Sequence, residues 1–405
     1  MLGVGALGYF ASGVGQSHLL GVFTTPITGS LGISRTAVST AYAAATLVAA
    51  FGLPYVGRLV DRFGMRRVAI LVALVLGLAA VGFGQVQGVI ALTFGFMLLR
   101  FFGQGAVMLT SGNLVAQWFD RKRGFALSLM SLGFFLSVAV HPPLVQWLIG
   151  AVGWREAWLW LGLATWILLL PAYLLLIQNK PEDLGLQPDG RPPDASIDGA
   201  EPPPLAEVGL TSSEAIQTPA FWVIAGSLAT FSILLTGLFF HQVSIFASRG
   251  LPAGVATGVF SVVAISAVIA VPLFGRLLDR GPTQPIFAAG LLTLSLALVT
   301  AALVDGLVSA IVYSIAFGIA NAAVHAHLVF LWPRFFGRRH LGSIQGIGQT
   351  VSIVGASLGP IPFGLAFDLF GTYDGALWLF ALQPAVFAVL VLTMRPPDLT
   401  GGRRA

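Results

Sequence analysis

Residues 54–67 read PYVGRLVDRFGMRR and lie between two long apolar runs. Residues 272–280 read PLFGRLLDR, so Pro, Gly, Arg, Leu, Asp and Arg recur at the same spacing 218 residues later. The same offset relates three further pairs of residues: Gly124 and Gly342, Pro142 and Pro360, and Gly153 and Gly371. Self-similarity at a fixed period indicates an internal repeat, and we predict one unit of about two hundred residues written twice.

The composition indicates an integral membrane protein. Charged residues make up 9% of the 405 residues, the apolar set makes up 56%, and the mean hydropathy is +0.89. A soluble domain carries about 25% charged residues. The apolar runs are continuous for about twenty residues, the length of a membrane-crossing helix, and lack the alternation of barrel strands. The chain has no cysteine, which excludes disulfides and thiolate metal sites.

Hydropathy predicts twelve membrane spans in two halves of six, at 3–23, 36–57, 68–86, 88–118, 124–149, 154–177, 220–246, 254–275, 285–304, 307–332, 342–366 and 374–394. The segment between the halves holds seven acidic residues and two proline clusters, a composition typical of a polar linker. We therefore predict a first half at 1–177, a linker at 178–213 and a second half at 214–405.

The basic residues predict how the chain is oriented. If both termini and the linker are cytoplasmic, seventeen Lys and Arg residues lie inside and three lie outside, which is the bias of membrane proteins. The positive charge is scattered over short loops between spans. We therefore attribute the pI near 10.0 to basic residues that mark the cytoplasmic loops, and we expect no nucleic-acid partner. An even number of spans in each half predicts two copies in the same orientation with a cavity between them.

Residues 57–67 resemble the signature between helices 2 and 3 of the major facilitator superfamily, and 275–280 resemble its copy between helices 8 and 9. Residues 100–105, RFFGQG, are similar to the family's helix 4 motif. The resemblance implies an all-α transporter fold of twelve helices in two pseudo-symmetric halves. Within the family, 118–124 (WFDRKRG), 181–190 (PEDLGLQPDG) and 338–343 (RRHLGS) resemble the oxalate/formate antiporter and monocarboxylate porter branch.

The resemblance assigns a conformational switch to two short segments. It implies a charge network that locks one conformation, with Gly57, Asp61, Arg62, Gly64, Arg66, Arg67, Gly275, Asp279 and Arg280 as its members. Physically, Asp61 can cap a helix N-terminus or pair with an arginine, and Gly57 can let helices approach closely. The alternative is that the arginines only set the topology.

Arg100 is the one charge predicted deep within a span. A central arginine costs about 2.5–3.5 kcal/mol on insertion scales, so such residues face a cavity or a partner. One interpretation is that Arg100 meets a substrate carboxylate or tunes a nearby proton site. The other is that it bonds helix carbonyls and braces its own helix.

Five of the six histidines lie in predicted spans: His18, His141, His241, His325 and His327. Histidine titrates near pH 6.5 and can carry a proton or bond a carboxylate. We take His18, His141, His241 and His325 as candidate substrate ligands, and the last three as candidates for proton coupling. Because His325 and His327 are two residues apart, they cannot share a helix face. Each of the five can also be a satisfied donor between helices.

Uncharged polar residues complete the candidate site. Helices 1, 4, 7 and 10 line the cavity in the resembled family, which implies roles for Tyr9, Gln16, Gln104, Asn113, Gln242 and Asn321. Gln345 and Gln349 are four residues apart and share a face of helix 11, and we include Gln349 as a substrate ligand. Each of these residues can instead join neighbouring helices.

Dicarboxylate exchangers of the resembled branch use a basic residue in helix 8 and another in helix 11. Residues 254–275 and 342–366 contain none here. We therefore expect a small organic anion, specifically a monocarboxylate, carried by alternating access with proton coupling, as symport or antiport, by a monomer in the cell (inner) membrane. The alternative is proton-driven efflux of hydrophobic compounds. The sequence has no metal cluster, nucleophile triad or phosphate loop that would support an enzyme, and we expect no cofactor. A channel would not need a two-fold repeat with a switch motif, so the repeat favours a transporter.

Overall fold

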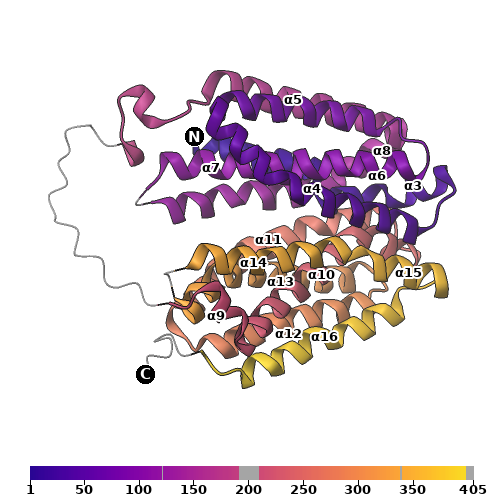
Figure 1. Ribbon diagram of the computed structural model, residues 1–405. Helices are drawn as coiled ribbons and strands as arrows, with labels where there is room; N and C mark the ends of the chain where they lie inside the picture. Colours follow the sequence, from indigo (N-terminus) through magenta and orange to yellow (C-terminus); the bar gives the residue numbers. More distant parts are fainter. Residues whose placement is uncertain (121, 191–208, 338–339, 398–405) are drawn as a thin grey trace. The chain divides into compact units, whose positions relative to one another are not determined.

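The computed structural model describes residues 1–120, 122–190, 209–337 and 340–397 (Figure 1). Within these ranges the regular elements are helices, and the extended backbone includes an isolated bridge between Gly209 and Gly337. The all-α fold class is thereby confirmed. Some residues used in the topology argument lie outside the described ranges: Arg121, Arg191, Arg338, Arg339, Arg403 and Arg404. The same holds for the part of the predicted linker at 191–208.

In the described residues, ten helical stretches are long and apolar enough to cross a membrane by length and composition. They agree with the predicted spans within a few residues at most ends. The elements concerned are α4 (Arg35–Phe63), α5 (Met65–Phe83), α6 (Gly88–Leu99) with η3 (Arg100–Val107) and α7 (Met108–Trp118), α8 (Arg123–Leu176), α10 (Pro219–Ala247), α11 (Ala253–Arg280), α12 (Thr283–Ala302), α13 (Leu307–Phe336), α14 (Leu341–Leu358) with α15 (Pro360–Phe370), and α16 (Asp374–Thr393).

The first predicted span is interrupted, which corrects the single helix expected at 3–23. It comprises five short elements: α1 (Leu2–Ala11), η1 (Ser12–Gly15), α2 (Ser17–Leu20), η2 (Gly21–Phe23) and α3 (Thr24–Leu31). Between η1 and α2, Gln16 is extended with φ −93° and ψ 152°. The break leaves backbone groups without helical partners, and the site described below is built around it. A new helix, α4, then begins after Ser34, whose hydroxyl accepts a hydrogen bond of 3.0 Å from Ala37 N–H.

The fifth and sixth predicted spans form the single element α8, which reverses direction at one residue. Gly153 has φ 83° and ψ 161°, a conformation that residues with a Cβ rarely adopt. Its repeat partner Gly371, which ends α15, also has a positive φ of 69°. The offset of 218 residues therefore pairs two glycines that both serve as chain reversals.

By density of contacts the chain divides into two units. Unit 1 comprises Met1–Ser196 and Phe239–Ser261, and unit 2 comprises Ile197–Leu238 and Val262–Ala405. The second half of α10 and the first turns of α11 thus belong with the N-terminal helices. The predicted boundaries at 177 and 214 follow the order of the spans along the chain, whereas these units follow packing, and the predicted division remains a prediction.

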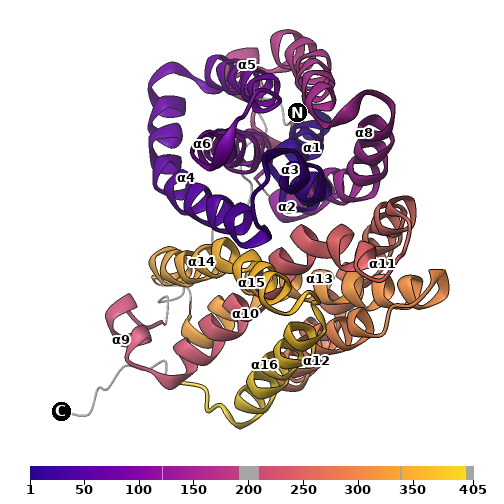
Figure 2. The ribbon, with the colours of Figure 1, turned by 90° about the vertical axis from the view of Figure 1, so that its right-hand side faces the viewer.

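Each unit is a helical bundle with an aromatic core. In unit 1, α8 lies beside α1 and α5, and α4 lies beside α6 (Figure 2). There Trp158 is fully buried and packs on Phe23 and Phe83, with ring centroids 4.5 and 4.6 Å away. In unit 2, α12 lies between α13 and α16 in the contact pattern, and Trp332 packs on Phe221 at 5.5 Å. Each such ring buries a large apolar area, and the aliphatic side chains of the core pack around the rings.

Candidate functional site

Arg100 lies at the start of the π-helix η3 in unit 1, and only 4% of its surface is exposed. Its Nε donates to Thr46 Oγ1 and its Nη1 donates to the Gly15 carbonyl oxygen, both at 3.0 Å. The guanidinium carbon lies 4.8 Å from the centre of the Tyr42 ring, within the range of a cation–π interaction. All of these partners are neutral, so the structure places a charge in the span without a carboxylate beside it.

The local fold explains why Gly15 can accept this bond. Because Gln16 is extended, the following amides of Leu19 and Leu20 bond to the Gln16 carbonyl, and the Gly15 carbonyl is released from the helical ladder. The interrupted span also lies directly against η3: a Cβ on Gly15 would be 2.2 Å from the Leu99 carbonyl oxygen. Arg100 therefore braces the broken first span, whereas one of the two interpretations expected it to brace its own helix, and it also retains donors for another ligand.

Two predicted histidines are joined through a serine in the same unit. His18 Nε2 is 3.1 Å from Ser137 Oγ, and Ser137 Oγ is 2.8 Å from His141 Nδ1. All three side chains are buried, with exposed fractions of 1%, 0% and 5%. His141 stacks on Phe10 with ring centroids 4.6 Å apart, and His18 meets the ring of Phe134 edge-on. The structure thus brings His18 and His141 to one site.

The remaining unit 1 candidates lie at separate contacts. His241 on α10 is fully buried, and its Nε2 is 3.2 Å from Ser39 Oγ on α4. Gln16 Nε2 is 3.1 Å from Met108 Sδ, and Gln242 Nε2 donates to the Ala256 carbonyl at 2.8 Å. The backbone of Gln104 lies near Gly15. Among the other polar candidates, Tyr9 is half-buried and Asn113 is exposed.

The unit 2 candidates lie on α13 and α14. His327 is buried between Phe274 and Phe287, whereas His325 is exposed, as their spacing predicts. Asn321 is 3% exposed, and its Oδ1 has no hydrogen-bond partner in this part of the chain. Gln349 is exposed and Gln345 is half-buried. These residues remain candidates for a substrate-facing wall of unit 2.

Sequence reasoning missed four residues that complete the unit 1 site: Ser39, Tyr42, Thr46 and Ser137. A usable signal existed for Ser137, because it lies four residues before the predicted candidate His141 and shares a helix face with it. Ser39, Tyr42 and Thr46 had no such signal, because their contacts with His241 and Arg100 join different helices.

The switch signature of residues 57–67 forms the end of α4 and the start of α5. Gly64 reverses the chain with φ 85°, and the Arg66 amide donates to Asn179 Oδ1 at 2.9 Å. The Arg66 guanidinium donates to the Leu174 carbonyl near the end of α8. Asp61 makes no ion pair or hydrogen bond with the described residues, so the charge network remains a prediction.

Two of the three switch glycines, Gly57 and Gly275, do not pack closely against the described residues. A Cβ at Gly57 or Gly275 would meet no described atom within 4 Å, which corrects the close helix approach expected at Gly57. The remaining residues of the two signatures, Arg62, Arg67, Asp279 and Arg280, are exposed.

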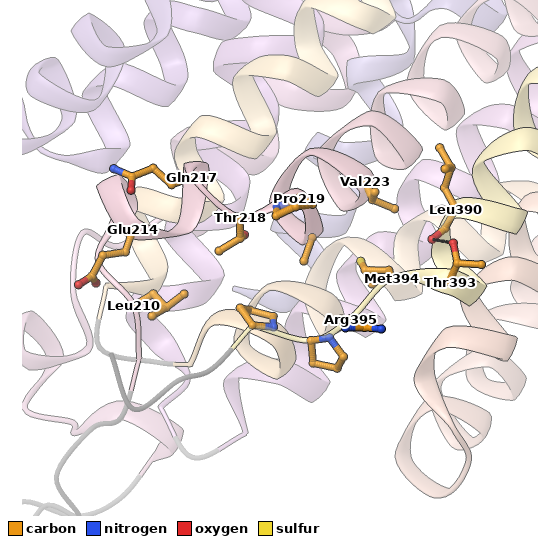
Figure 3. Close-up of a pocket in the computed structure, with 13 residues that line it drawn as sticks. Leu210, Glu214, Gln217, Thr218, Pro219, Val223, Leu390, Thr393, Met394 and Arg395 are labelled. Carbon is orange, nitrogen blue, oxygen red and sulfur yellow. Dashed lines mark hydrogen bonds between the residues drawn. The ribbon is translucent and has the colours of Figure 1, made fainter. Parts of the chain in front are cut away.

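A cavity of about 750 Å³ lies in unit 2, away from all predicted site residues (Figure 3). Its wall joins α9 (Ser212–Ile216), the start of α10 and the end of α16, with Glu214, Thr218, Val223, Leu390 and Arg395 among the lining residues. Thr211 and Glu214 cap α9 reciprocally. The described residues also hold no group of three or more His, Asp or Glu side chains placed to bind a metal ion.

Comparison with known proteins supplies the context for this geometry. The family model described as Major Facilitator Superfamily matches residues 5–360 and 245–404. The probable sulfoacetate transporter SauU of Cupriavidus necator is 25% identical over an alignment that covers 99% of this chain and 96% of that protein. The oxalate:formate antiporter of Oxalobacter formigenes is 29% identical over 61% of this chain and 54% of its own length.

Among solved structures, a bacterial homolog of the human lysosomal transporter Spinster matches this fold. The TM-score is 0.73, the identity is 16%, and the match covers 97% of this chain and 96% of the other. At this identity the likeness concerns the fold alone.

Proposed function

Because the chain belongs to the major facilitator superfamily, a family of multi-pass membrane transporters and not of enzymes, we propose that it carries a small organic anion, specifically a monocarboxylate, with coupling to protons. The proposal includes both coupling modes, symport and antiport. The main support for an anionic substrate is the environment of Arg100. The proton part rests on the buried histidines of the same unit.

Arg100 supports an anionic substrate because its charge is not balanced locally. A guanidinium has five N–H donors in a planar fork that suits carboxylates. Two of these donors bond Thr46 and Gly15, and Nη2 has no hydrogen-bond partner among the described residues. A buried cation held by neutral groups attracts an anion, since the interaction is strong where water is excluded.

The relatives named above agree with this substrate class. One is named for oxalate and formate and the other for sulfoacetate, and all of these are small organic anions. The histidines support protons as the coupling ion, because an imidazole gains and loses a proton near neutral pH. The candidates for this role remain His141, His241 and His325.

The repeat supports alternating access as the mechanism. We propose that residues 1–177 rock against 214–405, that the linker at 178–213 and both termini are cytoplasmic, and that a monomer suffices for transport. The switch residues on the α4–α5 connection and at 275–280 would bias this motion. In such a transporter the bound anion is exposed to each side of the membrane in turn.

Counterflow in proteoliposomes tests the substrate class. Vesicles loaded with formate, a monocarboxylate, should accumulate labelled formate from outside, and the dianions oxalate and sulfoacetate are compared in the same assay. Arg100→Gln should abolish the exchange while Arg100→Lys retains part of it. Arg155→Gln is the matched control, because Arg155 also donates to backbone carbonyls, those of Gly84 and Val86, but lies at the chain reversal. Exchange of hydrophobic compounds in place of anions, unaffected by Arg100→Gln, would establish the efflux alternative.

A further inference from the structure

We propose that His18, Ser137 and His141 form a relay that holds a single proton and passes it between α2 and α8. This inference deepens the proposed function, on which its role in transport rests, by naming the proton site and its capacity. Ser137 Oγ lies within hydrogen-bond distance of both imidazoles, at 3.1 Å from His18 Nε2 and 2.8 Å from His141 Nδ1. The hydroxyl is therefore the only bridge that the described residues place between the two rings.

The valence of a hydroxyl sets the capacity of the relay. A serine hydroxyl has one hydrogen to donate and two lone pairs to accept. With one added proton, the charged imidazole donates to Ser137 Oγ and the hydroxyl donates to the neutral imidazole, so both bonds are made. With two added protons, both rings donate to the hydroxyl, its own hydrogen has no acceptor in the relay, and two like charges share a buried site. Burial of such charges is costly, and we infer a capacity of one proton.

The transfer itself balances without any other reactant. In one direction, the N–H bond at His141 Nδ1 breaks and an O–H bond forms at Ser137, while the original Ser137 O–H bond breaks and an N–H bond forms at His18 Nε2. His141 is left neutral with its proton on Nε2, and His18 becomes charged. Two short bonds thus move one positive charge from α8 to the first residues after the break in the first span.

The packing around His18, Ser137 and His141 is consistent with a proton relay. A Cβ on Gly13 would be 2.1 Å from Ser137 Oγ and 2.3 Å from His141 Nδ1, so the polar atoms lie directly against the backbone of η1. Phe10, Phe134 and Phe239 cover the rings.

Other titratable or charged groups lie on the elements packed around the relay. Away from the helix ends these are Tyr9 on α1, Tyr42 on α4, Arg100 on η3, Tyr173 on α8 and His241 on α10. Arg100, which bonds Gly15 three residues before His18, is permanently charged, and its charge acts on His18. An anion bound to Arg100 would offset that charge and favour a proton on His18, which would link the substrate to the relay.

A first experiment tests the relay without any substrate. The protein is labelled with ¹⁵N-histidine in nanodiscs, and the signals of His18 and His141 are assigned with single His→Gln variants. In the wild type we expect one proton to be taken up by the pair, with the same midpoint at both rings. In Ser137→Ala the rings should titrate with separate midpoints, and Ser137→Thr, which keeps a hydroxyl, should restore the shared one. Separate midpoints in the wild type, or a shared midpoint in Ser137→Ala, would overturn the relay.

A second experiment tests its use in transport. Proteoliposomes containing the pH dye pyranine are mixed with external sulfoacetate or formate, and internal acidification is followed. Ser137→Ala should lose acidification by at least about tenfold while keeping anion counterflow, and Ser137→Thr should recover it.

Ser314→Ala is the matched control, because Ser314 is also a fully buried helix serine but donates to its own helix at Ala310. Counterflow without any change of internal pH in the wild type, neither the acidification of symport nor the alkalinisation of antiport, would refute proton coupling, and hence the role of the relay in transport, whatever the titration shows. Normal acidification by Ser137→Ala would refute that role alone.

Discussion

Arg100 Nη1 donates a hydrogen bond of 3.0 Å to the carbonyl oxygen of Gly15, at the point where the first membrane span is broken. A buried carbonyl outside the helical ladder needs a donor, and a buried guanidinium needs acceptors. The bond satisfies both needs at once. It makes Arg100 part of the local fold as well as a candidate anion ligand, and the two roles can be separated by experiment.

Replacing Arg100 should first reveal its structural role. Arg100→Gln leaves the Gly15 carbonyl without its donor, and we expect the free energy of unfolding to fall by about 1–3 kcal/mol. Arg100→Lys keeps the charge but cannot supply the planar fork, so it should also be less stable than the wild type. Thermal unfolding in detergent, with and without sulfoacetate, measures both effects. A wild-type melting temperature in Arg100→Gln would show that the bond to Gly15 contributes nothing.

A methyl group at Gly15 should disturb the packing of the break on η3. The Cβ of Gly15→Ala would meet the Leu99 carbonyl at 2.2 Å and the Gln104 amide nitrogen at 2.8 Å. Neither backbone atom can easily move, so overpacking should cost about 1–3 kcal/mol. Gly82→Ala is the control, because a Cβ at Gly82 meets no described atom within 4 Å and alanine favours a helix. Equal melting temperatures for the two variants would contradict the packing described here.

The first turn of α5 should be stabilised by only one of its two arginines. Arg66 donates to the Leu174 carbonyl near the end of α8, whereas Arg67 is exposed and makes no contact of this kind in the described residues. Arg66→Gln should therefore lower the free energy of unfolding by about 0.5–1.5 kcal/mol, and Arg67→Gln should leave it unchanged. Chemical denaturation in mild detergent measures the difference. Equal losses in both variants would indicate a general charge effect.

His327 should tolerate loss of its polar atoms. Its Nε2 is buried without a hydrogen-bond partner in the described residues, and its ring stacks on Phe287 with centroids 4.8 Å apart. Phenylalanine keeps the ring and removes the unsatisfied nitrogen, but it also removes the contact of Nδ1 with the Ala323 carbonyl of the same helix. The two effects oppose each other, so His327→Phe should melt close to the wild-type temperature. Anion-driven acidification of proteoliposomes should also be unchanged. A loss of acidification in a folded His327→Phe protein would place His327 on a proton path.

The sequence predicted the spans well because the bilayer sets the length of an apolar run, and hydropathy reads that length directly. It did not predict the break at Gln16. Residues 12–18 read SGVGQSH and are rich in glycine and polar side chains, but hydropathy averaged over a whole span does not register so short a run. The break is stabilised by Gly103 and Arg100, which lie more than eighty residues away in the chain. Long-range contacts of this kind have no local pattern.

The candidate site was predictable by residue type but not by partner. An intramembrane arginine or histidine is conspicuous in an apolar chain, and Arg100, His18 and His141 were all expected to matter. Which side chains they contact depends on how each helix is rotated, and the sequence does not specify that rotation. Ser137 and Thr46 therefore emerged only from the structure, although their spacing from His141 and Tyr42 agrees with a shared helix face.

The reversal at Gly153 joins two spans of α8 through a single residue. Such a short junction keeps the adjoining ends of the two spans together, so a displacement of one span at this end must be shared by the other. The reversal at Gly153 also has no loop that a protease could cleave or an antibody could bind, and a tag inserted there would separate the two spans. Ser137 and His141 lie on the first of these two spans, which ties their position to the movement of the second.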